Sequence, residues 1–143
     1  MGTGSDHREI VAVAVRYASA CDTRDWKLFE DVFVPDVRTE YGTEFRLEGR
    51  DEVVAMIRSM LGGCGPTQHL LGSHSVSVDG DRATSSCAIR AFHIGIGAAT
   101  GKSYEAIGAY HDELVRTRAG WRISRRRMDV IAELGTRDVL APG

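Results

Sequence analysis

The chain has 143 residues, of which 43% are hydrophobic and 27% are charged, a composition typical of one globular domain spanning residues 1–143. Its formal net charge of −2 gives no reason to expect nucleic acid or an anionic membrane as a partner. No apolar run approaches the roughly 18 residues needed to cross a bilayer. The first ten residues also lack the charged leader and apolar core of a signal peptide. We therefore expect a cytoplasmic protein.

The cysteines and the usual catalytic motifs narrow the chemistry. Cys21, Cys64 and Cys87 are odd in number and have no CxxC spacing, which predicts free thiols and no zinc site built from cysteine. One carboxylate and two histidines can in principle bind a metal, but no spacing in the chain requires one. The sequence contains no G-x-S-x-G, P-loop or HExxH motif. We expect chemistry without a metal or cofactor.

Helical periodicity dominates the start of the chain. A first helix is predicted from about Asp6 to Ala20, with Asp6 as its cap and Glu9 completing a capping box. Residues 1–5 are then expected to form a flexible arm. Apolar residues at helical spacing predict one buried stripe, made of Ile10, Val13, Ala14, Tyr17 and Cys21.

Three shorter elements follow. The segment "WKLFEDVF" predicts a second helix, capped by Asp25 and ended by Pro35. The segment "VRTEYGTEFRLEG" predicts a pair of short strands turning near Gly42. A third helix is expected at Asp51–Leu61, with Val54, Ile57 and Leu61 on its apolar stripe, and it ends at "GGCGP".

The rest of the chain reads as strands. Two long strands should meet at Asp79-Gly80, a strong hairpin signal, and "KSYEAIGAYHDELVRT" and "WRISRRRMDVIAEL" should form two more. Helices followed by long antiparallel strands predict an α+β domain in which a curved sheet wraps over the helices.

Asp22 and His69 are the first candidates for chemistry. Asp22 follows the buried stripe of the first helix, where a carboxylate is costly unless it is paired, although aspartate is also common in turns. His69 begins the first long strand, and its residue type permits catalysis as well as packing. His74 lies five residues further on and is expected to face outwards.

Other strand residues are candidates because of the direction in which they point. His93 shares a strand face with Cys87, Ile89 and Ala91, so it should point inwards. Tyr41 lies on the face of Val37 and Thr39, as a pocket residue or as a core tyrosine with its tip at the rim.

The run "SRRRMD" places three arginines on one strand. Arg126 should share a face with Met128, whereas Arg125 and Arg127 lie opposite. An inward arginine needs an anionic partner or ligand. The alternative is a solvated face or an oligomer interface.

Three segments together carry a resemblance to a known family: "YASACDTRDWKLFEDVF", "TQHLLGSHSVSVDGDRA" and "GAYHDELVRTRAGWRISRR". From about Ile10 to Met128 the chain resembles the SnoaL-like branch of the nuclear-transport-factor-like superfamily. Scytalone dehydratase and hexachlorocyclohexane dehydrochlorinase are characterised relatives. The resemblance implies a cone-shaped, curved mixed sheet, packed around N-terminal helices and enclosing a deep pocket.

The resemblance also implies roles for residues. It makes Asp22 and His69 a catalytic pair, and Tyr41 and His93 pocket residues that donate hydrogen bonds to an oxygen gaining charge. Arg126 would assist a leaving group. Cys21 stands where the dehydratase has a tyrosine, and the polar pocket positions of its penultimate strand become Gly108 and Tyr110 here, so Tyr110 joins the substrate-binding set.

The implied activity is a cofactor-independent lyase of the dehydratase or dehydrohalogenase type, acting on a small, largely apolar cyclic molecule. An isomerase or polyketide cyclase with the same base, or a non-catalytic domain that binds small molecules, remain alternatives. Relatives pack the outer sheet face against a second copy, so we expect a homo-oligomer, a dimer or trimer. Arg90, Arg125, Arg127 and Trp121 would supply that face.

Overall fold

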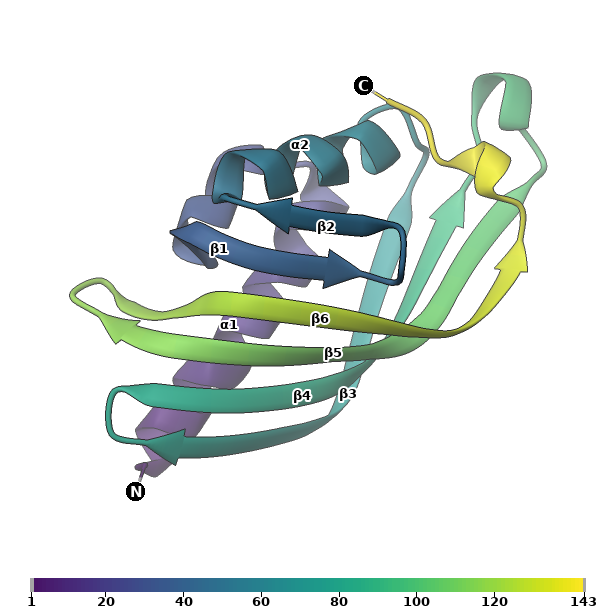
Figure 1. Ribbon diagram of the computed structural model, residues 1–143. Helices are drawn as coiled ribbons and strands as arrows, with labels where there is room; N and C mark the ends of the chain where they lie inside the picture. Colours follow the sequence, from purple (N-terminus) through teal and green to yellow (C-terminus); the bar gives the residue numbers. More distant parts are fainter. Residues whose placement is uncertain (1, 143) are drawn as a thin grey trace.

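One long helix and one strongly curved sheet make up most of the computed structural model, which describes residues 2–142 (Figure 1). The helical elements are α1 (Gly4–Thr23), η1 (Trp26–Asp31), α2 (Arg50–Leu61), η2 (Gly97–Ala99) and η3 (Arg137–Val139). The strands are β1 (Phe33–Tyr41), β2 (Phe45–Glu48), β3 (Thr67–Asp79), β4 (Arg82–Ile94), β5 (Ser103–Thr117) and β6 (Gly120–Gly135). None of the described helices is long and apolar enough to cross a membrane.

The sheet is mixed and open. Its strand order is β2-β1-β6-β5-β4-β3, and all neighbours are antiparallel except β1 and β6. The helices α1 and α2 lie on its concave side (Figure 1). The predicted α+β cone is therefore confirmed.

The cap of α1 differs from the sequence prediction. The Thr3 side chain accepts a hydrogen bond from the Asp6 amide at 3.0 Å, and the Asp6 carboxylate accepts one from the Thr3 amide at 3.2 Å. Asp6 is thus the third helical residue of the capping box, and Glu9 is exposed. Thr3, Gly4 and Ser5 form the cap and first turn, where the sequence suggested a flexible arm. The predicted stripe from Ile10 to Cys21 is buried as expected.

The second predicted helix is shorter than expected. Asp25 caps it, accepting a hydrogen bond from the Leu28 amide, but it is a 3₁₀ helix that ends at Asp31. Pro35 lies inside β1 and does not terminate a helix. The β1–β6 pairing is interrupted between Phe33 and Arg38, so the missing N–H of proline breaks no ladder there.

The predicted turns are confirmed. Tyr41 pairs with Phe45 across the turn at Gly42, and Asp79 pairs with Arg82 across a turn in which Gly80 has a φ of 61°. Helix α2 begins one residue earlier than expected. Its fully buried residues are Val53, Ile57 and Leu61, and Val54 is half-buried.

Three β-bulges in the β3–β4 and β5–β6 pairings set which residues face the pocket. The β3–β4 register shifts between Gly72 and Ser75. The β5–β6 register shifts twice, between Ile107 and Gly108 and between Glu113 and Leu114. Each bulge inserts a residue, so the inward positions change parity along the strand. As a result Trp121, Ile123 and Arg126 all lie on the inner face of β6.

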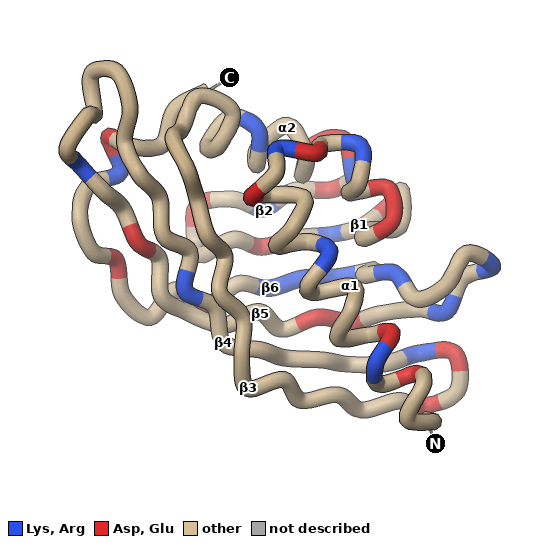
Figure 2. Tube along the Cα trace, turned by 180° about the vertical axis from the view of Figure 1, so that it is seen from behind, with Lys and Arg blue, Asp and Glu red and all other residues tan. Residues whose placement is uncertain are grey.

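The outer face is largely as predicted, with one correction. Arg90, Arg125 and Arg127 are exposed, and basic residues follow β6 while most of β3 is uncharged (Figure 2). Trp121, however, is buried and not part of that face. Its Nε1–H donates to Asp6 at 3.2 Å, and the Arg116 guanidinium lies 4.5 Å from its ring.

Candidate active site

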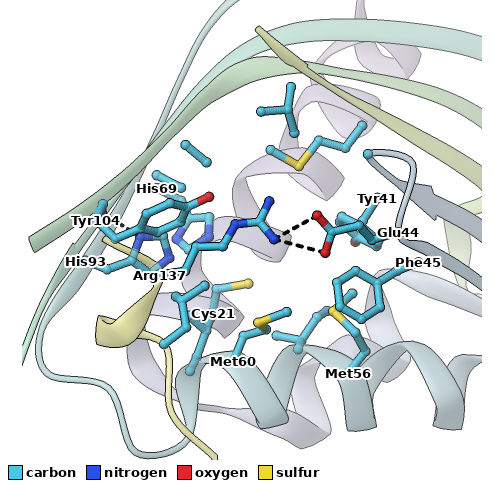
Figure 3. A pocket seen from close by; sticks show the side chains of 18 of the residues that line it. Cys21, Tyr41, Glu44, Phe45, Met56, Met60, His69, His93, Tyr104 and Arg137 are labelled. Carbon is cyan, nitrogen blue, oxygen red and sulfur yellow. Dashed lines mark hydrogen bonds and ion pairs between the residues drawn. The ribbon is translucent and has the colours of Figure 1, made fainter. Parts of the chain in front are cut away.

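A cavity of about 150 Å³ opens between the concave face of the sheet, the C-terminal end of α1, α2 and the segment after β6 (Figure 3). Much of its wall is apolar, including Phe45, Met56, Ile57, Met60, Leu61, Ala91, Ala106, Met128, Val130 and Leu140. Its polar side chains are Tyr17, Cys21, Tyr41, Glu44, His69, His93, Tyr104, Tyr110 and Arg137. The sequence candidates Tyr41, His69, His93 and Tyr110 thus line one pocket.

Asp22 and His69 are in direct contact at the inner end of this pocket. Asp22 lies in the last turn of α1 and His69 near the start of β3. The His69 Nδ1 atom is 2.7 Å from Asp22 Oδ1, and the His69 backbone amide donates to Asp22 Oδ2 at 2.8 Å. A third hydrogen bond to the carboxylate comes from the Thr67 hydroxyl at 2.9 Å. This contact resolves the alternative between a turn aspartate and a paired one.

The charge on Asp22 determines which nitrogen of His69 is available. Burial raises the pKa of Asp22, but the hydrogen bonds from His69 and Thr67 outweigh it, and the pKa lies below its ordinary value. An ionised carboxylate only accepts hydrogen bonds, so Nδ1 of His69 carries the hydrogen. Neutral His69 therefore keeps the lone pair of Nε2 for a pocket ligand.

Arg24, which the sequence analysis did not single out, holds this arrangement in place. It ends α1 in the left-handed conformation, with φ 57°. Its guanidinium donates to the Thr67 hydroxyl at 2.8 Å and to the carbonyls of Cys21, Leu61 and Gly65 at 2.6–2.8 Å. In a sequence, an arginine in a turn that holds a site together looks the same as an arginine exposed to solvent. No sequence signal could therefore have identified the role of Arg24.

His93 is buried as predicted, but in its neutral form it has no hydrogen left to donate to a ligand in the pocket. Its Nδ1 lies 3.0 Å from the Tyr104 carbonyl oxygen, which only accepts, so Nδ1 carries the hydrogen and Nε2 is an acceptor. Burial lowers the pKa of His93, and the nearby His69 acts in the same direction. This geometry corrects the expected role: neutral His93 accepts a hydrogen bond and does not donate one to a developing oxyanion.

Two tyrosines that line the pocket are hydrogen-bonded to each other. The Tyr41 hydroxyl donates to the Tyr17 hydroxyl at 3.0 Å. The Tyr17 ring packs edge-to-face on His69, with centroids 6.4 Å apart, and on Tyr110 at 5.5 Å. Tyr17 was assigned to the core stripe by its helical spacing, which cannot tell a core tyrosine from one whose hydroxyl reaches a cavity.

Arg126 does not reach the pocket. It is completely buried and forms a bidentate pair with Asp112, with bonds of 2.8 and 2.9 Å. Its guanidinium lies 4.2 Å from the Tyr17 ring centroid and 3.9 Å from that of Tyr110. The expectation that Arg126 contacts a leaving group is therefore wrong in this structure. The anionic partner that an inward arginine requires is supplied by Asp112.

Charged residues gather at the mouth of the pocket. Arg137 Nη1 donates to both carboxylate oxygens of Glu44, at 2.8 and 2.9 Å (Figure 3). Its Nε donates to Glu133, which also accepts from the Tyr104 hydroxyl, both at 2.6 Å. This network joins the β1–β2 turn to η3.

The thiol of Cys21, which also lines the pocket, is not activated as a nucleophile. Burial raises the pKa of Cys21 to about 12, so it stays protonated at neutral pH. Across residues 2–142, no three His, Cys, Asp or Glu side chains are grouped as metal ligands would be.

The cone fold, with its Asp–His contact inside an apolar pocket, defines a small α+β domain of the SnoaL-like kind. Residues 3–127 match the family model described as the SnoaL-like domain, and the chain belongs to this family. The uncharacterized protein Rv2910c of Mycobacterium tuberculosis is 36% identical over 124 residues, covering 85% of this chain and 83% of that protein.

Solved structures share the fold. Kfla4162 of Kribbella flavida superposes with a TM-score of 0.87 at 24% identity, covering 94% of this chain and 96% of that one. A provisionally named scytalone dehydratase of Novosphingobium aromaticivorans has a TM-score of 0.82 at 20% identity, covering 94% and 90%. A type 2 hexachlorocyclohexane dehydrochlorinase has a TM-score of 0.81 at 12% identity, covering 92% and 89%. These neighbours include enzymes of the dehydratase and dehydrochlorinase kinds, and at these identities the likeness shows the fold.

Proposed function

We propose that this protein is a cofactor-independent lyase in which His69, held by Asp22, removes a proton from a small, largely apolar cyclic substrate. The observation that carries this proposal is the 2.7 Å contact between His69 Nδ1 and Asp22 Oδ1, which in the neutral ring directs the lone pair of Nε2 to the pocket. A histidine oriented in this way by a carboxylate is the usual arrangement of a general base.

The proposed reaction is a β-elimination. His69 Nε2 takes a proton from a carbon made acidic by a neighbouring carbonyl or leaving group. The C–H electron pair becomes the new double bond, and the leaving group departs with its own bonding pair. The imidazolium formed on His69 is stabilised by the Asp22 carboxylate. A halide can leave as an anion, whereas hydroxide needs a proton, which the imidazolium can return to give water.

The pocket limits the substrate. A cavity of about 150 Å³ accommodates a molecule of roughly one six-membered ring. Its apolar walls favour a ring with few polar groups, and the acceptor Nε2 of His93 favours a substrate that carries a hydroxyl. The names of two structural neighbours, a dehydratase and a dehydrochlorinase, support elimination as the reaction class.

An isomerase or cyclase is the second candidate, and one observation favours it. The only cationic side chain among the described pocket residues is Arg137, at the mouth, because Arg126 is paired with Asp112 out of reach. A site with no cation at its inner end is suited to reactions in which the proton is returned to another carbon and no anion departs.

Hydrogen–deuterium exchange into simple cyclic ketones distinguishes these candidate functions. Ketones with and without a β-hydroxyl or β-chloro substituent are incubated with the protein in D₂O and followed by NMR. Exchange with elimination indicates a lyase, and exchange without elimination indicates an isomerase or cyclase. Binding without exchange indicates a non-catalytic domain.

Two variants connect the result to the proposed base. His69→Gln should abolish exchange, because glutamine keeps the approximate shape but cannot accept a proton at neutral pH. His74→Gln is the matched control, since His74 is exposed on the same strand and should leave exchange unchanged. Equal exchange by wild type and His69→Gln would remove His69 from the mechanism.

A further inference from the structure

The guanidinium of Arg24, at the C-terminal end of α1, directs all five of its N–H groups at protein acceptors. An arginine side chain has five such donors and no acceptor. The bonds measure 2.6–3.5 Å and go to the carbonyls of Cys21, Leu61, Cys64 and Gly65 and to the hydroxyl of Thr67. These bonds hold the cation in one orientation, one hydroxyl group away from Asp22.

Asp22 occupies an unfavourable place for a carboxylate. It lies in the last turn of α1, where the helix dipole leaves a partial negative charge. That turn, residues 20–23, contains no basic residue. Arg24 follows directly and supplies a cation there, and it also binds the Leu61 carbonyl at the end of α2. One arginine thus offsets the negative ends of two helices whose last turns line the pocket.

The Thr67 hydroxyl connects this cation to the Asp22–His69 pair in one direction only. A guanidinium only donates, so the Thr67 oxygen accepts from Arg24 Nη1 at 2.8 Å. Its single hydrogen is left for Asp22 Oδ1, which is 2.9 Å away. The same carboxylate oxygen lies 2.7 Å from His69 Nδ1. The Thr67 hydroxyl and the His69 ring therefore share one acceptor atom.

Two donors on one oxygen compete for its negative charge. A hydroxyl that accepts a hydrogen bond from a cation is polarised and becomes a stronger donor itself. Burial raises the pKa of Asp22, but hydrogen bonds from His69 and Thr67 bring it below its ordinary value. The Thr67 hydroxyl thus helps to keep Asp22 ionised, and it takes up part of the charge that would otherwise attract a second proton to His69.

We propose that Arg24 is a positioning residue of the Asp22–His69 pair, which it influences through the Thr67 hydroxyl without touching the substrate. We call this arrangement the Arg24–Thr67 relay. The relay holds Asp22 as an ionised acceptor and tempers its pull on His69, so that the neutral ring, with its lone pair on Nε2, is the resting form. The inference deepens the proposed function and rests on it only for the effect on proton removal.

NMR of the unliganded protein tests the relay without any substrate. Thr67→Val removes the hydroxyl, keeps the branched shape and leaves the other four hydrogen bonds of the Arg24 guanidinium in place. The carboxyl carbon of Asp22 should titrate at higher pH in this variant, because one donor is lost. At neutral pH the Nδ1–H proton of His69 should move downfield, because its bond to Oδ1 becomes stronger. Thr67→Ser retains a hydroxyl and should restore both signals.

Thr23→Val is the matched control for the threonine. Thr23 is next to Asp22, but its hydroxyl donates to the Ser19 carbonyl at 2.7 Å. Both NMR signals should therefore stay at their wild-type positions in this variant. Melting temperatures report separately how far each substitution disturbs the fold.

Two substitutions of the arginine test the source of the effect. Arg24→Met removes the cation and should move both signals in the same direction as Thr67→Val. Arg24→Lys keeps a charge and should move them less. Arg24→Met also leaves four carbonyls without this donor and risks unfolding. In that event the Thr67 variants decide the matter.

Deuterium exchange into a cyclic ketone measures the effect on proton removal. In Thr67→Val the acid limb of the pH–rate profile should lie at higher pH than in wild type. The rate at pH 6, relative to the alkaline plateau, should fall by about threefold, while the plateau itself is retained. A substitution that merely displaces the base would lower the plateau and leave the acid limb where it is.

Two results would overturn the proposal: NMR signals in Thr67→Val equal to those in Thr23→Val, or a lowered plateau with an unmoved acid limb. Shifted signals in a protein that shows no deuterium exchange would support the relay and count against the proposed base. Exchange that requires His69 but is accompanied by no NMR shift would support the base and remove the relay. The two failures are therefore distinguishable.

Discussion

The two carboxylate oxygens of Asp22 bind two different atoms of His69. One carboxylate oxygen lies 2.7 Å from the imidazole Nδ1, and the other accepts the His69 backbone amide at 2.8 Å. The backbone bond fixes the start of β3 relative to the end of α1, and the side-chain bond fixes the ring. The carboxylate thus sets both the position and the tautomer of the imidazole.

Substitutions in this pair should not combine multiplicatively. A general base contributes about 10²–10⁴-fold, so Asp22→Asn and His69→Gln should each lose most of that factor. The double variant should be scarcely slower than either single variant, because residues acting as one unit share a single effect. Turnover or exchange rates of all three variants test this. Rate losses that multiply fully would show that the two residues work independently.

Acid should remove a stabilising contribution from Asp22. Its folded-state pKa lies below the ordinary value of 3.8, so the ionised form stabilises the folded state at pH values above about 4. This contribution is lost as the pH falls through the folded-state pKa. The free energy of unfolding of wild type minus that of Asp22→Asn should therefore become smaller from pH 6 to pH 3. Denaturant titrations at both values measure it, and a difference that grows in acid would contradict the assignment.

His93 should recognise a hydroxyl on the ligand. Because its Nδ1–H is used by the Tyr104 carbonyl, its Nε2 accepts. For a pair of cyclic ketones differing by one ring hydroxyl, His93→Phe should selectively weaken the hydroxylated member, by about 1–3 kcal/mol, the cost of an unpaired buried polar group. Calorimetric titration of both compounds provides the comparison. An equal loss for both would indicate that His93 only fills space.

The ion pair between Arg137 and Glu44 should control access to the pocket. Both side chains are about half exposed, so the pair is worth no more than about 1 kcal/mol and is weakened by salt. Glu44→Gln should speed ligand association and dissociation by up to about fivefold while changing the dissociation constant less. Stopped-flow measurements should show that high salt accelerates exchange in wild type but not in this variant. Equal salt effects in both would separate the pair from ligand entry.

We propose that copies of this chain associate through the outer face of the sheet. Leu70 and Phe92 are 60% and 39% exposed on that face, and Leu70 pairs with the exposed Arg90 of β4. Wild type should scatter light as a dimer or trimer of the 15.6 kDa chain at micromolar concentration. Leu70→Glu should shift it towards the monomer by placing a charge in an apolar contact. A monomeric wild type would defeat this expectation.

Local patterns in the sequence determine most of the secondary structure. The helical spacing from Ile10 to Cys21, the Asp79-Gly80 turn and the alternation that turns His93 inwards each depend on a few neighbouring residues, and each is confirmed. The cap of α1 shows where such patterns become ambiguous. Thr3 and Asp6 both satisfy the sequence rules for a helix cap. Asp6 takes the third helical position, where its carboxylate accepts hydrogen bonds from Arg116 and Trp121, more than a hundred residues away.

Partners far apart in the chain are decided only by the tertiary structure. The resemblance named Asp22 and His69 together, but their contact spans 47 residues and depends on where α1 ends against β3. Arg126 predicts an anionic partner, and the antiparallel register of β5 and β6, shifted by a bulge, places Asp112 opposite it. Helical spacing likewise identifies Tyr17 as buried without showing that its hydroxyl meets a cavity. Spacing and turn chemistry are properties of short segments, whereas hydrogen-bond partners depend on strand register and helix packing, which the whole chain sets.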